Sequence, residues 1–110
     1  MRLALAFLTL VLAIHSTRAA DSISGQGDFR YRHVPGWGEE ALARVSVNNG
    51  HSIAVDSTGR ILFLTDDPQN NVIILDPEGH LLNTWTARMP GAHGMALIEE
   101  GGGEHLFITD

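Results

Sequence analysis

The chain has 110 residues, with seven basic and thirteen acidic side chains and no cysteine, so its formal net charge is −6 at pH 7. This balance excludes a nucleic-acid-binding protein, which needs a basic surface, and it disfavours binding to an anionic membrane. Disulfides are excluded as well. A domain this small must therefore be stabilised by its core, by a metal or by further chain.

Residues 1–20 have the pattern of a secretory signal peptide. Arg2 precedes an apolar run at 3–14, and small residues follow, with Ala19 or Ala20 as the last residue before cleavage. The run is too short for a good membrane span, and no later segment is apolar enough for one; an uncleaved anchor is the alternative. We therefore expect a secreted or periplasmic protein that has no stable membrane span after cleavage. Five arginines against thirteen acids then give the mature chain a net charge of 5 − 13 = −8.

Residues 21–49 are predicted to form a polar N-terminal segment with an entry strand. The stretch DSISGQGD, at 21–28, is typical of a flexible start. In FRYRHV, at 29–34, aromatic and imidazole side chains alternate with their neighbours, which predicts a short strand. Residues 41–47 fit either a loop or a weak strand.

The pattern becomes regular from Gly50 onward. Apolar, β-branched segments recur about every ten residues, and Gly, Pro, Asn or Asp residues separate them. This spacing predicts an antiparallel meander of four strands, with the sequences HSIAVD (51–56), RILFLTD (60–66), NVIILD (71–76) and HLLNTWT (80–86). No segment after the signal peptide has a convincing helical period.

The pattern then restarts. HGMALIEEGGGEHLFITD, at 93–110, overlays HSIAVDSTGRILFLTD, at 51–66, so that His93 falls on His51 and Phe107 on Phe63. A four-stranded unit that repeats after roughly forty residues is typical of a β-propeller blade. We therefore predict an all-β fold of antiparallel four-stranded blades, with one full blade at 50–91 and the first half of the next at 92–110. Because one and a half blades cannot close a propeller, we interpret the chain as the N-terminal fragment of a longer one.

Residues 50–110 also resemble the NHL repeat. The matching motifs stand in the order and spacing of that repeat: AVD at 54–56, TD at 65–66, NNV at 70–72 and DPEG at 76–79. The resemblance implies a propeller of six blades.

Two histidines occupy the same position in the two repeats. The first strand of a blade is innermost, so His51 and His93, which head such strands, are expected near one mouth of the central channel. Imidazoles that converge in this way suit zinc or another borderline metal. The alternative is that both are ordinary polar residues that bond to loop backbone.

The stretches at 93–110 and at 31–38 (YRHVPGWG) also resemble peptidylamidoglycolate lyases, the propeller enzymes that complete peptide amidation. The resemblance implies that His93 is a zinc ligand and that the carbonyls of Met95 and Ile53 bind a structural calcium; the family has no histidine at the position of His51. One departure matters, because Asp66 stands where the family has a catalytic arginine. The remaining zinc histidines and the catalytic tyrosine of that family would lie beyond the last residue of this sequence.

Two function classes follow from these patterns. The first is a metal-dependent lyase or hydrolase that acts on a peptide or small-molecule substrate, with the metal as a Lewis acid. The second is a non-catalytic propeller whose loops bind a protein or glycan partner. The carboxylates and amides of DDPQNN, at 66–71, also suit calcium, but they lack the EF-hand frame; Asp66 and Asp76 are more simply predicted to cap turns.

Overall fold

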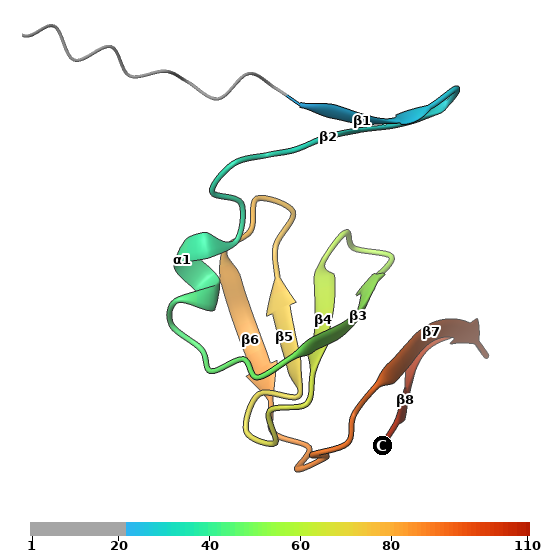
Figure 1. Cartoon of the computed structure of the whole chain (residues 1–110). Helices are drawn as coiled ribbons and strands as arrows, with labels where there is room; N and C mark the ends of the chain where they lie inside the picture. Colours follow the sequence, from blue (N-terminus) through green and yellow to red (C-terminus); the bar gives the residue numbers. More distant parts are fainter. Residues whose placement is uncertain (1–21) are drawn as a thin grey trace, which may run out of the picture. The chain divides into compact units, whose positions relative to one another are not determined.

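The computed structural model describes residues 22–110, so the predicted signal peptide at 1–20 lies outside the described residues. The chain divides into two compact units, Met1–Val34 and Pro35–Asp110, and each is considered by itself (Figure 1). Within the described residues the fold is all-β with antiparallel sheets, and the one α-helix, α1, has four residues. No helix in this part of the chain is long and apolar enough to cross a membrane.

The first unit contains a hairpin of β1 (Ile23–Gln26) and β2 (Phe29–Arg32). The entry strand predicted at 29–34 is thus present at 29–32. The start predicted to be flexible differs from expectation, because residues 23–26 pair with β2 in an antiparallel ladder. Backbone pairing orders this polar, Gly-rich stretch, whose side chains are all exposed and give no apolar pattern to read.

The second unit is built on a four-stranded antiparallel sheet, which coincides with the predicted full blade and is called the blade below. Its strands are β3 (Gly50–Val55), β4 (Ile61–Thr65), β5 (Val72–Leu75) and β6 (Leu81–Trp85), in that order and all antiparallel (Figure 1). The four-strand meander is therefore confirmed. β5 is buried at every position, as an inner strand of a sheet covered on both faces should be.

Asx turns close two of the hairpins in the blade. Asp56 Oδ1 accepts the backbone N–H groups of Thr58 and Arg60 at 3.0 and 2.9 Å. Asp76 Oδ1 accepts the N–H of His80 at 2.8 Å, which confirms its predicted role as a turn cap. Carboxylates of this kind satisfy turn donors that no strand partner reaches.

A short helix and its flanks cover one face of the blade. α1 (Glu39–Leu42) buries Ala41 against Ile73 and Leu75, and partly buried hydrophobic residues on both sides of the helix join this cluster. The segment at 41–47 is thus neither a strand nor wholly a loop. A helix of four residues is too short for a 3.6-residue period to appear in the sequence.

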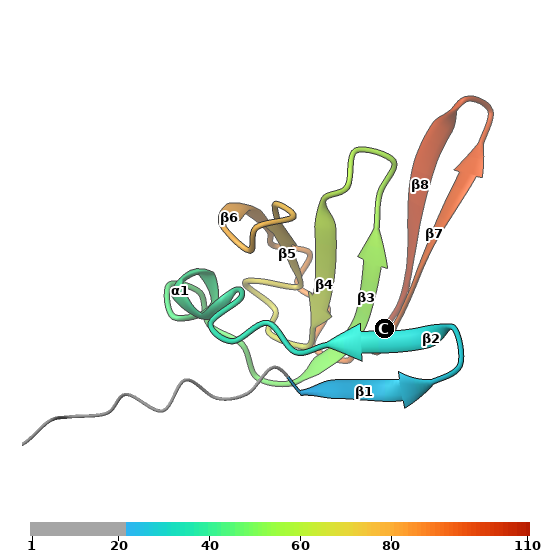
Figure 2. The same cartoon turned by 90° about the horizontal axis from the view of Figure 1, so that it is seen from above.

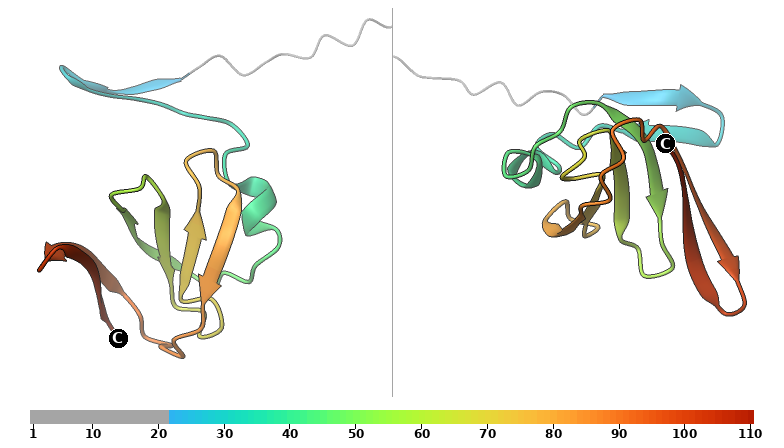
Figure 3. Two further views of the ribbon diagram at one scale, coloured as in Figure 1. Left: turned by 180° about the vertical axis from the view of Figure 1, so that it is seen from behind. Right: turned by 90° about the horizontal axis from the view of Figure 1, so that it is seen from below.

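A second hairpin packs on the opposite face of the blade. It consists of β7 (Gly94–Glu100) and β8 (Gly103–Thr109), and it buries Met95, Leu106 and Ile108 against the cluster around Leu62 and Leu64. β7 runs beside β3, the innermost strand in the propeller prediction, as Figures 2 and 3 show from several sides. The equivalent strands of the two repeats are thus neighbours, and no sheet among residues 22–110 closes into a ring.

The two repeats differ in register. In the blade, Gly50 pairs with Thr65 and Ser52 with Leu64, so that His51 is an extra residue in a β-bulge. In the second hairpin, Gly94 pairs with Thr109 and the ladder runs on without a shift. Phe63 consequently faces Ile53, whereas Phe107 faces Ala96.

Candidate functional site

His51 is placed by a β-bulge at the start of β3. A bulge leaves its residue outside the regular ladder and redirects the side chain, which is why bulges often occur beside functional sites. Here the imidazole is directed to the end of β4, where its Nε2 lies 3.2 Å from Asp66 Oδ2. Both side chains are mostly buried, at 17% and 19% exposure.

His93 stands immediately before β7. Its backbone N–H donates to the carbonyl of Thr109 at 2.9 Å, which fixes the residue at the head of the second hairpin. Its ring centroid lies 4.4 Å from that of His51, with the two planes inclined by 47°. The structure therefore brings together the two histidines that the sequence placed in equivalent positions.

Asp66 contacts His51 and the turn before β3. Asn49 donates to it twice, from its backbone N–H at 3.0 Å and from its side-chain amide at 2.8 Å. The Asn49 amide, with a smaller contribution from His51, holds the pKa of the Asp66 carboxyl below its usual value. Asp66 therefore caps a neighbouring strand. Asp66 thus accepts a backbone N–H from the turn before β3, as predicted for a turn cap, whereas the turn that follows β4 is capped by Asp67, which accepts the N–H of Gln69 at 2.8 Å.

Sequence reasoning missed the pairing of His51 with Asp66. The signal was present in principle: two residues that flank the open end of a hairpin lie opposite each other when the strands are antiparallel. What the sequence did not reveal is the bulge, which decides that residue 51 turns toward residue 66.

The predicted calcium ligands lie on the two adjacent strands. Ile53 is on β3, with its side chain 66% exposed, and Met95 is on β7, where it is half-buried. The Met95 carbonyl accepts the Ser52 hydroxyl at 3.5 Å, so this oxygen points out of its own hairpin toward β3. Calcium takes six to eight oxygen ligands. Two carbonyls on neighbouring strands would therefore supply only part of such a set.

The donors near His51 and His93 fit zinc only in part. A tetrahedral site needs four ligands, and the pair supplies two imidazoles. Asp66 is bonded to His51, which is the arrangement of a carboxylate that orients a metal-binding histidine. Among residues 22–110, no group of three or more His, Cys, Asp or Glu side chains is arranged to hold a metal.

A shallow depression opens beside the histidines. It is lined by Gly50, His51, Ser52, Ile53 and Phe63, and so combines polar groups with an aromatic wall. A small molecule held there would contact the His51 bulge directly.

Comparison with protein-family models, with curated proteins and with solved structures found no match. The likeness to NHL repeats and to the lyases therefore stays a prediction from the motifs quoted above.

Proposed function

We propose that this chain is part of an exported, six-bladed NHL-type propeller, lyase-like, with a divalent-metal site at the heads of its inner strands. One observation carries the proposal: His51 and His93 stand at the starts of two neighbouring strands, β3 and β7, and their rings lie 4.4 Å apart.

His93 and His51 would hold the metal, and Asp66 would orient His51. Because Asp66 is bonded at Nε2, the Nδ1 atom of His51 is left as the nitrogen able to bind a metal. A metal held there would act as a Lewis acid toward a peptide or small-molecule substrate in the adjoining depression. The Met95 and Ile53 carbonyls are the proposed oxygen ligands of a separate structural calcium.

The alternative is a non-catalytic propeller that binds a protein or glycan partner, and the state of Asp66 favours it. The lyase resemblance calls for a cation at this position. An ionised carboxylate instead stands there, tied to Asn49 and His51. A scaffold that retains the metal but lacks the charge that assists the reaction would have this arrangement.

Metal binding tests the proposal. The mature protein, stripped with a chelator and dialysed against Zn²⁺, should bind zinc, and His93→Ala should weaken that binding by about tenfold or more. Asp66→Asn should weaken it by about tenfold as well, since carboxylates behind ligand histidines contribute on this scale. The matched control is His105→Ala, an exposed histidine on β8. Unchanged zinc affinity in His93→Ala, or an equal loss in His105→Ala, would refute the metal site.

A further inference from the structure

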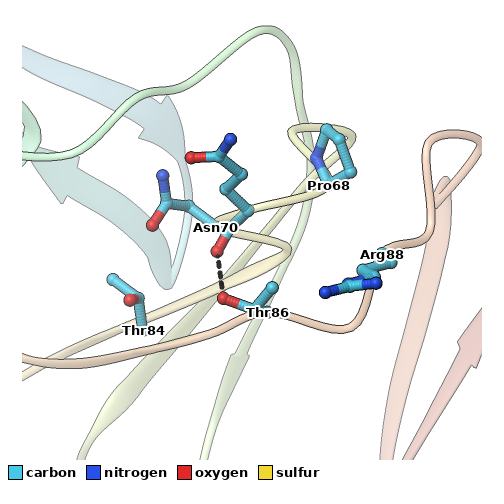
Figure 4. Close-up of a pocket in the computed structure, with 6 residues that line it drawn as sticks. Pro68, Asn70, Thr84, Thr86 and Arg88 are labelled. Carbon is cyan, nitrogen blue, oxygen red and sulfur yellow. Dashed lines mark hydrogen bonds between the residues drawn. The ribbon is translucent and has the colours of Figure 1, made fainter.

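A polar pocket lies at the edge of the blade opposite β3. It is lined by the β4–β5 turn and by the end of β6 with the residues that follow, namely Pro68, Gln69, Asn70, Thr84, Thr86 and Arg88 (Figure 4). β6 and β3 are the two edge strands of the four-stranded sheet. The pocket lies beside β6 and the histidine pair beside β3, so the two sites are distinct. None of its lining residues is acidic.

Hydrogen bonds hold the two walls of the pocket together. The Arg88 N–H donates to the Pro68 carbonyl at 3.2 Å, and the Thr86 hydroxyl donates to the Gln69 carbonyl at 2.7 Å (Figure 4). Behind them the buried Asn71 side chain brackets Met89, donating to its carbonyl at 2.7 Å and accepting its N–H at 3.0 Å. The pocket is thus preorganised, which lowers the entropic cost of binding.

Arg88 is held in an unusual backbone conformation. Its φ is 59°, and it is the one non-glycine residue with a positive φ among residues 22–110. This conformation costs a residue with a Cβ about 1 kcal/mol or more. Strained backbone conformations of this kind are often found at functional sites. The conformation directs the guanidinium into the pocket, toward Thr86 (Figure 4).

The charge of Arg88 is uncompensated within the described residues. Arg44 pairs with Glu40 and Arg60 with Asp56, whereas Arg88, like Arg30 and Arg32, is exposed and forms no ion pair with the described residues. The nearest acid along the turn, Asp67, is buried and accepts from Ser46 and from the backbone of Gln69. A guanidinium in this state offers a two-pronged donor to a carboxylate.

The remaining lining groups can exchange hydrogen bonds with the hydroxyl groups of a ligand. Asn70 donates to the Ser46 carbonyl, so its side-chain oxygen is left to accept, and the Thr84 hydroxyl makes no hydrogen bond with the other described residues. Together with Gln69, these groups line the same pocket as the guanidinium, with Thr86 between them and Arg88 (Figure 4). We propose that this pocket binds an acidic saccharide, with the carboxylate on Arg88 and the adjacent hydroxyls on the amide and threonine groups.

NMR titration of the mature, ¹⁵N-labelled protein with galacturonate tests this. We expect roughly millimolar affinity, as befits one charged contact and a few neutral ones, with shifts centred on Gln69, Asn70 and Arg88. Galactose and inorganic phosphate should each bind about tenfold more weakly, since each lacks one half of the recognised chemistry.

Arg88→Gly is the informative variant. Glycine adopts a positive φ without strain, so the fold should be kept or stabilised while galacturonate affinity falls by about tenfold or more. Arg88→Lys retains the positive charge but loses the two parallel N–H donors of the guanidinium, so it should lose part of the affinity for galacturonate. The matched control, Arg44→Ala, removes an exposed arginine that does not line this pocket, and this variant should bind as the wild type.

Three results would overturn the proposal. The first is equal galacturonate affinity in the wild type and Arg88→Gly. The second is a set of shifts that maps away from 68–70 and 84–88, and the third is binding of phosphate as tight as that of galacturonate, which would mark a simple oxyanion site. Zinc binding is unaffected by any of these outcomes, so the two proposals fail independently.

Discussion

Removal of the Asp56 carboxylate should destabilise the blade strongly. Asp56 lies in the β3–β4 turn, where its side chain is 3% exposed. Its Oδ1 accepts from Thr58 N–H, Thr58 hydroxyl and Arg60 N–H at 2.8–3.0 Å, and its Oδ2 accepts from the Arg60 guanidinium at 2.6 Å. Asp56→Ala leaves these donors without their acceptor, whereas Asp56→Asn keeps an acceptor oxygen and removes the charge.

The magnitude follows from the pKa. Burial raises the pKa of Asp56, but the hydrogen bonds from Thr58 and Arg60 outweigh it and lower the pKa from 3.8 to about 2. The ionised form therefore stabilises the fold by about 2 kcal/mol. Because the folded state binds this proton more weakly than the unfolded chain, the contribution is present above about pH 4 and is lost as the pH falls toward 2.

Urea unfolding followed by the fluorescence of Trp37 and Trp85 measures these effects. At pH 7, Asp56→Asn should lower the free energy of unfolding by about 1–2 kcal/mol and Asp56→Ala by about 3 kcal/mol. Near pH 2 the difference between the wild type and Asp56→Asn should vanish. Equal stability of the wild type and Asp56→Asn at pH 7, or a difference that persists at pH 2, would refute the reasoning.

Two further substitutions test the packing around the blade. Asn71→Ala removes the bonds to the Thr65 and Met89 carbonyls at 3.1 and 2.7 Å, so it should cost about 3 kcal/mol in urea unfolding; a cost below about 1 kcal/mol would mean that water replaces the amide. Gly79 has a φ of 92°, and an alanine there would place its Cβ 2.6 Å from the backbone nitrogen of Gly38. Gly79→Ala should therefore lower the free energy of unfolding by about 2–3 kcal/mol. Gly27→Ala, where φ is 59° and the space is open, is the control and should cost about 1 kcal/mol.

The sequence predicted those parts of the fold that local chemistry determines. The four strands of the blade were recognisable because β-branched runs alternate with turns such as DPEG, whose Asp76 closes its own turn in the structure. The segments missed were those whose order comes from distant partners. β1 has no apolar pattern and exists only by pairing with β2, and α1 forms where Ala41 meets Ile73 and Leu75 on the blade.

The candidate site was foreseen in its position but not in its geometry. The repeat placed His51 and His93 at equivalent points of two strands, and the structure puts their rings 4.4 Å apart. Whether a side chain at such a point faces its neighbour depends on register. The register shift between Gly50 and Ser52 has no counterpart at Gly94. Residues that are equivalent in the two sequence repeats therefore have different cross-strand partners.

This inequality accounts for the different surroundings of the two histidines. The bulge turns His51 to Asp66, which Asn49 holds in place from the preceding turn, so the ring is mostly buried and oriented. His93 stands just before a strand whose register is not shifted, and it is exposed. The two imidazoles therefore lie side by side with unequal freedom, because a carboxylate orients one of them and the other is exposed. Asp66, which departs from the lyase pattern, is therefore the residue that orients His51.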